Sequence, residues 1–133
     1  MTASRALLDT SVFIAHESGR ELEAAALPDE LYVSVVSLAE LHAGVYAAKV
    51  TDTRARRLET VESLARFELL PVGAEAARHW ARLRYRLAEA GRRINVNDLW
   101  IASVALANRM PVATQDRDYD ALEGLEGPAV IRV

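Results

Sequence analysis

Cysteine is absent from this sequence of 133 residues, and its absence removes several kinds of site at once. Without thiols the chain has no disulfide, zinc–thiolate centre, iron–sulfur cluster or cysteine nucleophile. No apolar run approaches the roughly 18 residues that a membrane-spanning helix requires, and the first residues lack the long apolar core of a signal peptide. We therefore expect a cytoplasmic protein with no membrane partner, in which oxygen or histidine ligands hold any metal.

Lysine is nearly absent as well, because fifteen of the sixteen basic residues are arginine. Residues 51–93 contain ten arginines and six acids, a net charge of +4, whereas the rest of the chain has six basic and thirteen acidic groups, a net charge of −7. Arginine suits bidentate contact with phosphate, although a GC-rich genome produces the same bias. The pattern leaves a phosphate-binding surface and an ordinary solvated helix face equally open.

Short apolar runs alternate with helical patterns along the chain. We expect strands at 5–9, 31–36, 67–72, 111–114 and 129–133, and helices at 11–18, 19–26, 37–49, 52–66, 74–90 and 98–109. This alternation predicts an α/β fold of three layers, α/β/α, with a central, mainly parallel sheet of four to five strands. With 51% hydrophobic and 26% charged residues, the chain has the composition and length of one globular domain, residues 1–133.

Acidic residues follow two of the expected strands and lie near the start of two expected helices. Asp9 ends the first strand, and Asp116 follows the fourth. Glu40 lies in the first turn of the helix after the second strand, and Asp98 opens the helix before the fourth. Because ligands of open α/β sheets bind at the carboxyl ends of the strands, we expect these four carboxylates to meet at one rim.

Each acid also has an ordinary structural explanation. An Asp at a strand end, such as Asp9, commonly caps a turn or the next helix. Ser37 and Glu40 have the spacing of a capping box, and Asp98 after Asn97 would complement the dipole of a helix that Asn97 caps. Asp116, Asp118 and Asp120, after the fourth strand, are typical of a solvated loop or of the start of a small helix. Taken singly, none of the acids indicates a functional site.

Taken together, several carboxylates on one rim repel one another, so some of them would bind protons unless a cation lies among them. Oxygen ligands without cysteine or a histidine pair favour Mg²⁺ or Mn²⁺ over zinc. The three histidines are scattered, and we expect them at the surface or in packing. Thr10, Ser11 and Thr114 flank the acids, where their hydroxyls would orient a carboxylate or a bound water, or simply cap turns.

Four motifs occur in order along nearly the whole chain: Leu7-Leu8-Asp9-Thr10-Ser11, Ser37-Leu38-Ala39-Glu40-Leu41-His42-Ala43-Gly44, Asn97-Asp98-Leu99-Trp100-Ile101-Ala102-Ser103 and Val112-Ala113-Thr114-Gln115-Asp116-Arg117-Asp118-Tyr119-Asp120. This series resembles the PIN-domain ribonucleases, specifically the VapC-type toxins of bacterial type II toxin–antitoxin systems. No single motif is specific to this family, but the four motifs in this order are specific to it. Tyr119 stands where many members have Phe, a change that we expect to leave the site undisturbed.

The resemblance implies a PIN-like fold and a divalent-metal-dependent endoribonuclease in which an acid cluster holds Mg²⁺ or Mn²⁺ directly or through water. Metal-activated water would attack the RNA phosphate and leave a 5′-phosphate and a 3′-hydroxyl. Asp9, Asp98 and Asp116 would form the ligand core, with Asp118 as a further ligand. Glu40 would orient the attacking water or act as a base. By the same resemblance, Thr114 is a supporting hydroxyl.

The resemblance also implies partners, namely an RNA substrate, a second copy of the chain in a homodimer, and a small antitoxin whose C-terminal segment reaches the active site. We expect Arg92 and Arg93, which lie just before the third motif, to offset the negative charge of the acid cluster so that RNA can bind. Apolar residues in 11–26 and 37–49 would serve an antitoxin groove or ordinary core packing.

Two other classes of protein compete with this interpretation. A catalytically silent PIN-like module that binds RNA or protein would keep the fold and use the acids as caps. A receiver domain also places acids around Mg²⁺, but it needs a paired acid near the first strand and a late lysine. Here Asp9 has no acidic neighbour and Lys49 is the only lysine, which argues against a receiver domain.

Overall fold

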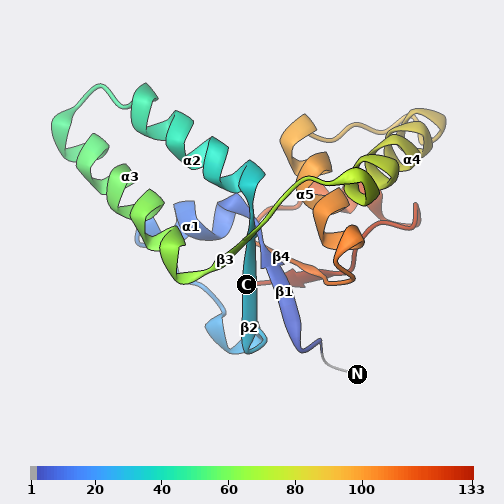
Figure 1. Ribbon diagram of the computed structural model, residues 1–133, viewed down its shortest axis with the longest axis horizontal. Coiled ribbons are helices and arrows are strands. Elements are labelled where there is room, and N and C mark those ends of the chain that lie inside the picture. Colours follow the sequence, from blue (N-terminus) through green and yellow to red (C-terminus); the bar gives the residue numbers. More distant parts are fainter. Residues whose placement is uncertain (1–2) are drawn as a thin grey trace.

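The computed structural model describes residues 3–133, in which five strands form one open sheet (Figure 1). All the strand pairs are parallel. In the order β3-β2-β1-β4-β5, the strands are β1 (Arg5–Leu8), β2 (Glu30–Ser34), β3 (Glu68–Leu70), β4 (Val112–Thr114) and β5 (Val130–Arg132). The chain leaves β1 toward one edge of the sheet and later returns to β4 on the opposite side of β1. This reversal is a topological switch point, beside which such sheets bind their ligands.

Helices cover both faces of the sheet, three on one face and two on the other (Figure 1). The first group is α1 (Thr10–Glu17), α2 (Val35–Ala47) and α3 (Thr51–Ser63), and the second is α4 (Ala74–Ala90) and α5 (Val96–Ala107). Three short 3-10 segments are η1 (Ala24–Ala26), η2 (Leu64–Arg66) and η3 (Asp118–Leu122). The predicted three-layer α/β/α architecture is confirmed. Among residues 3–133, no helix has the length and hydrophobicity needed to cross a bilayer.

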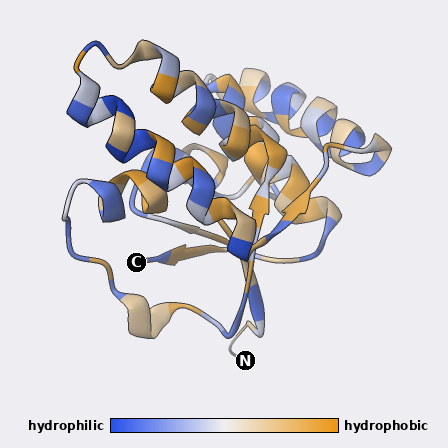
Figure 2. Ribbon diagram, turned by 60° about the vertical axis from the view of Figure 1, so that its left-hand side comes forward, coloured by the Kyte–Doolittle hydropathy of each residue, from blue (hydrophilic) through white to orange (hydrophobic). Residues whose placement is uncertain are grey.

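The alternation of side chains along β1 builds a separate core on each face of the sheet. Ala6 and Leu8 point to the face that packs against α1, α2 and α3, whereas Leu7 points to the face that packs against α4 and α5. All three are buried. Figure 2 shows the hydrophobic residues gathered in the middle of the molecule. The central strands are therefore held on both faces, which gives their carboxyl ends a rigid base.

The expected helix at 19–26 is wrong, because only the short segment η1 forms there. Gly19 adopts a left-handed backbone with φ of 75°. Its N–H donates to His16 O at 3.2 Å, and Arg20 N–H donates to Ala15 O at 2.9 Å. These two bonds form a Schellman motif, which ends α1 and turns the chain away from the helix axis.

Two helices begin earlier than the sequence pattern predicts. Ser34, rather than Ser37, caps α2, and its Oγ accepts the N–H of Val36 at 3.0 Å. Asn95, rather than Asn97, caps α5, and its Oδ1 accepts the N–H of Asn97 at 2.8 Å. The capping-box interpretation of Glu40 is therefore wrong, and its carboxylate is available for other contacts.

Candidate active site

A cavity of about 250 Å³ lies beyond the carboxyl ends of β1 and β4. Its lining includes all five acids that the sequence singled out: Asp9, Glu40, Asp98, Asp116 and Asp118. They reach it from the ends of β1 and β4, from α2 and α5, and from the start of η3. Parallel strands bring these distant parts of the chain together because their carboxyl ends share one edge.

Asp9 is the most buried member of this group, at 1% exposed. Its Oδ2 accepts hydrogen bonds from Thr114 Oγ1 at 3.0 Å and from the N–H of Ser11 at 3.3 Å. Its Oδ1 accepts a hydrogen bond from the hydroxyl of Tyr119 at 2.8 Å. The bond to Ser11 makes Asp9 the N-cap of α1. The same carboxylate therefore caps a helix and lines the acid cavity.

Buried hydroxyls connect Asp9 to the segment that carries Asp116. Thr114 Oγ1 donates to Asp9 and accepts the N–H of Asp116 at 2.9 Å. Ser11 Oγ lies 3.1 Å from Thr114 Oγ1 and accepts the N–H of Gln115 at 3.1 Å. Ser11 and Thr114 thus hold the chain after β4 in place, and the hydroxyl of Thr114 also donates to the carboxylate of Asp9.

Glu40 lies in the second turn of α2, and both of its carboxylate oxygens are held. Thr10 Oγ1 donates to Glu40 Oε1 at 2.7 Å, and Asn97 Nδ2 donates to Glu40 Oε2 at 3.3 Å. Thr10 Oγ1 also lies 2.7 Å from Ser37 Oγ. Because Thr10 gives its single proton to Glu40, Ser37 donates to Thr10. These contacts join α1, α2 and α5 around one carboxylate.

The crowding of these acids changes their protonation. Burial, followed by the charges of Asp9, Asp118 and Glu40, raises the pKa of Asp98 to about 7. Burial and the same negative neighbours Asp9 and Asp118 also raise the pKa of Asp116, although the charge of Arg20 acts in the opposite direction. Near neutral pH the cavity therefore retains a proton or attracts a cation.

Arg20 and Asn95, which line the cavity, and Tyr119, which contacts Asp9, were not singled out as site residues from the sequence. Arg20 lines the cavity, and no local pattern indicates its position, because the turn at Gly19 places it there. Tyr119 was expected to leave the site undisturbed, but its hydroxyl contacts Asp9 directly. Burial and the charge of Asp9 raise the pKa of Tyr119 far above its ordinary value, so the hydroxyl keeps its proton.

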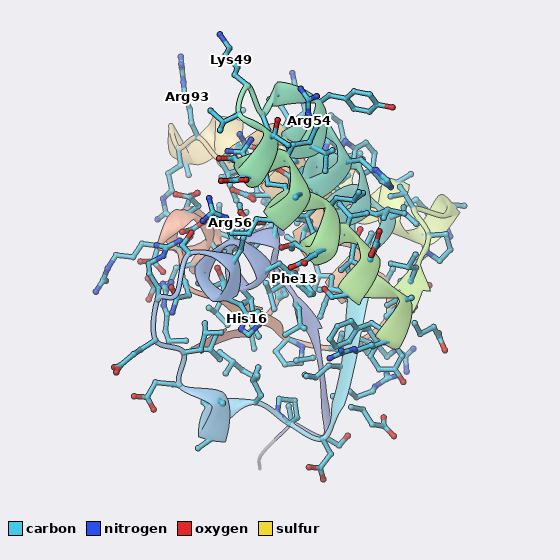
Figure 3. All side chains as sticks on the ribbon, turned by 90° about the vertical axis from the view of Figure 1, so that its left-hand side faces the viewer. Phe13, His16, Lys49, Arg54, Arg56 and Arg93 are labelled. Carbon is cyan, nitrogen blue, oxygen red and sulfur yellow. The ribbon has the colours of Figure 1, made fainter. Side chains whose placement is uncertain are left out.

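The two arginines expected to assist RNA binding lie in different surroundings. Arg92 Nη1 donates to the carbonyls of Glu123 at 2.7 Å and Ala121 at 3.3 Å, so it ties the end of α4 to the segment around η3. Arg93 is exposed and lines a hollow that shares Asn95 and Asp118 with the acid cavity. Figure 3 shows Arg93 extending away from the ribbon.

The histidines lie outside the acid cavity, as expected. His16 and His42 are exposed, and His79 is partly exposed on α4. His16 lines a separate hollow with Phe13 and Arg56, and all three are labelled in Figure 3. Imidazole ligands therefore do not contribute to the acid cavity.

The donor set of the cavity fits a hard divalent cation. Its titratable ligands are carboxylates, and their mutual repulsion raises the pKa of Asp98. Within residues 3–133, no group of three or more acidic or histidine side chains is arranged to hold a metal ion by itself. Mg²⁺ commonly keeps several waters and takes only one or two carboxylates, so an open arrangement of this kind suits it.

This fold and this cavity place the molecule among the PIN domains. The PIN domain family model matches residues 6–125, and the chain belongs to this family. Within the family it is a VapC-type protein. It is 57% identical to Ribonuclease VapC5 of Mycobacterium tuberculosis over 132 residues, which cover 99% of this chain and 98% of that relative. It is 41% identical to Ribonuclease VapC4 of the same organism, over 95% of this chain and 97% of that relative.

Solved structures agree with this assignment. A crystal structure of VapBC-5 from Mycobacterium tuberculosis, described as a member of the VapBC family of toxin–antitoxin systems, matches with a TM-score of 0.91 and 54% identity. The match covers 98% of this chain and 99% of that one. A crystal structure of FitAcB from Neisseria gonorrhoeae matches with a TM-score of 0.74 and 27% identity, over 94% of this chain and 95% of that one. The predicted PIN-like fold is therefore confirmed.

Proposed function

We propose that this protein is the toxin of a toxin–antitoxin pair and that it cuts RNA by metal-dependent hydrolysis. The observation that carries the proposal is the meeting of five acids from distant parts of the chain in one cavity at the topological switch point. The names of the relatives, Ribonuclease VapC5 and Ribonuclease VapC4, support RNA as the substrate.

Asp9, Asp98 and Asp116, with Asp118 as a further ligand, would hold Mg²⁺ or Mn²⁺, one or two of them directly and the others through bound water. When bound, the ion would supply Lewis acidity toward water and toward the phosphate oxygens. The contacts of Thr114 and Ser11 orient Asp9 before any ion binds. Asp98, whose pKa is raised to about 7, would give up its proton as the ion binds.

Glu40 is the candidate base. Thr10 donates a hydrogen bond to one oxygen of its carboxylate, and Asn97 donates one to the other oxygen. These two bonds orient the carboxylate, and each oxygen can still accept a further hydrogen bond. From there Glu40 would align an attacking water and take its proton at a carboxylate oxygen. In this proposal Thr10 therefore acts through Glu40, whereas Thr114 acts through Asp9.

RNA is an anion and needs positive charge near this acidic cavity. Arg20 lines the cavity, and Arg93 lies in the adjoining hollow. Arg92 is engaged by backbone carbonyls, so its contribution would be less direct than that of Arg93. We propose Arg93 and Arg20 as the nearer contacts for the phosphates of the substrate.

The partner that we propose is an antitoxin, because the VapBC-5 structure that this chain matches is described as a member of a family of toxin–antitoxin systems. A groove of about 330 Å³ adjoins the acid cavity, with which it shares Thr10, Ile14 and Glu40. Ile14 is 43% exposed although it is hydrophobic. An antitoxin segment in this groove would cover Ile14 and reach the acids. A homodimer remains a prediction, which the molar mass in solution would test.

The direct test of the nuclease proposal compares RNA cleavage by the wild type and by Asp98→Asn. The protein is purified free of antitoxin and assayed on a broad RNA panel with Mg²⁺ or Mn²⁺. We expect the wild type to cleave RNA and the cleavage rate of the variant to be at least about 100-fold lower. This loss is larger than the loss expected for a residue that only supports a metal ligand. Asp29→Asn, an exposed acid before β2, is the matched control and should cleave normally. A wild type that cleaves no RNA in either metal would favour the silent binding module.

A further inference from the structure

Tyr119 joins the acid cavity to the core beneath it. Its side chain comes from η3, immediately after Asp118, and belongs to the core cluster that packs against α4 and α5. Only 2% of the residue is exposed, yet its hydroxyl lies 2.8 Å from Asp9 Oδ1. A packed aromatic ring therefore delivers one hydrogen bond to the most buried carboxylate of the site.

The donors around Asp9 divide unevenly between its two oxygens. Oδ2 accepts from both Thr114 and Ser11, which use its two lone pairs. Among the donors of residues 3–133, the hydroxyl of Tyr119 is the one that reaches Oδ1. One acceptor position on Oδ1 is therefore left over. Because donors hold the carboxylate from both sides, its rotation is set before a cation arrives.

We propose that Tyr119 is a positioning residue of the nuclease site, whose hydroxyl sets the rotation of the Asp9 carboxylate and leaves one Oδ1 position for a divalent cation. This inference rests on the proposed function. It assigns the hydroxyl a role that the sequence did not predict, since Tyr119 was expected to leave the site undisturbed. The hydroxyl also withdraws charge from Oδ1, which weakens that oxygen as a ligand. The gain from a preset orientation outweighs this effect, as is usual for groups that support metal ligands.

The experiment compares Tyr119→Phe with the wild type by calorimetric titration of Mn²⁺ into the metal-free protein. This variant removes one oxygen atom and keeps the ring. We expect the affinity for Mn²⁺ to fall by about 10-fold to 100-fold. In RNA cleavage, kcat at limiting Mn²⁺ should fall, KM for RNA should stay unchanged, and excess Mn²⁺ should restore kcat. In protein that is fully folded, simple loss of packing would leave the Mn²⁺ affinity unchanged.

Tyr32→Phe is the matched control. Tyr32 lies on β2, is partly buried and packs against the same core cluster, but within residues 3–133 its hydroxyl is not among the donors to Asp9. It should bind Mn²⁺ like the wild type. All measurements are made at a temperature at which circular dichroism shows both variants folded. Equal Mn²⁺ affinity and equal kcat in Tyr119→Phe and the wild type would overturn the inference.

The two proposals fail in different ways. If the wild type binds Mn²⁺ and cleaves no RNA, the nuclease proposal fails, while a lower Mn²⁺ affinity in Tyr119→Phe still supports the positioning of Asp9. If the wild type cleaves RNA and Tyr119→Phe matches it in both measurements, the nuclease proposal stands and the role of Tyr119 does not.

Discussion

Two acidic regions flank the segment after β4, and their carboxylates have different partners. In the acid cavity, hydroxyl and amide groups hold Asp9 and Glu40. On the other side, around η3 and β5, Asp120 pairs with Arg132, and Glu126 lies 3.7 Å from Arg82 and 3.5 Å from Arg86. Arginine partners neutralise the second group, whereas neutral donors orient the first without cancelling its charge.

The difference shows that the number of acids does not identify a site. Glu126 has a side chain that is 68% exposed and is paired with cations, so water and arginine already satisfy it. Asp98 is partly buried among like charges, and its pKa is raised to about 7. Negative charge at a sheet edge that arginines compensate only in part is therefore the property that marks a place for a cation.

The largest contrast should come from removing one carboxylate in each region. Asp9→Asn replaces a buried acceptor that three donors hold, so we expect RNA cleavage to fall by about 100-fold or more and the affinity for Mn²⁺ to fall with it. Glu126→Gln should leave both unchanged. Cleavage rates and Mn²⁺ titrations of the two variants measure this, and equal rates would remove the distinction between the regions.

Stability should show a smaller contrast. Thr114→Val keeps the shape of the side chain but removes the hydroxyl that donates to Asp9 and accepts from Asp116. Because the partners remain buried, we expect a loss of about 1–3 kcal/mol in the free energy of unfolding. Glu126→Gln breaks exposed ion pairs and should cost about 0–1 kcal/mol. Urea unfolding compares the two, and a larger loss for Glu126→Gln would contradict the expected order.

The acid cavity should also make stability depend on pH in the metal-free protein. The folded pKa of Asp98, about 7, lies above the ordinary value of 3.8, so the folded state binds more protons between these values. The stabilising contribution of Asp98 is therefore fully present below about pH 4 and is lost as pH rises through about 7. After allowance for solvent screening, we expect Asp98 to contribute about 1 kcal/mol.

Thermal unfolding in chelator from pH 4 to pH 8 measures this loss, with Asp98→Asn as the comparison. The variant should show a flatter profile, since its amide does not titrate. Adding Mn²⁺ at pH 7 should raise the midpoint of the wild type and hardly move that of Asp98→Asn. Equal shifts in the two proteins would place the ion elsewhere.

The smallest effect concerns arginines near each region. Arg93→Ala, in the hollow beside the acid cavity, should weaken RNA binding and lower the salt slope by about one. Arg86→Ala, beside Glu126, should leave the slope unchanged. RNA binding by a variant that does not cleave, such as Asp98→Asn, is titrated at several salt concentrations. An unchanged slope for Arg93→Ala would place it outside the path of the RNA.

Local pattern predicted most of the fold because strands and amphipathic helices follow from neighbours in sequence. The helix expected at 74–90 coincides with α4, and the five expected strands all contain the observed ones or overlap them. The helix caps were harder to predict from the sequence, because Ser34 and Ser37 have the same side chain and lie about one helical turn apart. Ser34 caps α2, which lets Ser37 contact Thr10 across the helix interface.

The identity of the acids could be anticipated, but their surroundings could not. Strand ends and helix starts are readable along the chain, and a shared sheet edge follows from parallel pairing, so Asp9 and Asp116 were expected to meet. Nothing adjacent in sequence indicates that Tyr119 reaches Asp9, 110 residues earlier, or that Arg20 lines the cavity. Those contacts depend on the packing of η3 and on the turn at Gly19.

Residue types and their order thus decide the class of fold, the exclusion of thiol chemistry and the set of carboxylates. Folding decides which oxygen of Asp9 is occupied, which acid retains a proton and which arginine is engaged by backbone carbonyls. The reason is that hydrogen bonding and charge interactions act over a few ångströms in space, and only the folded chain brings these groups that close.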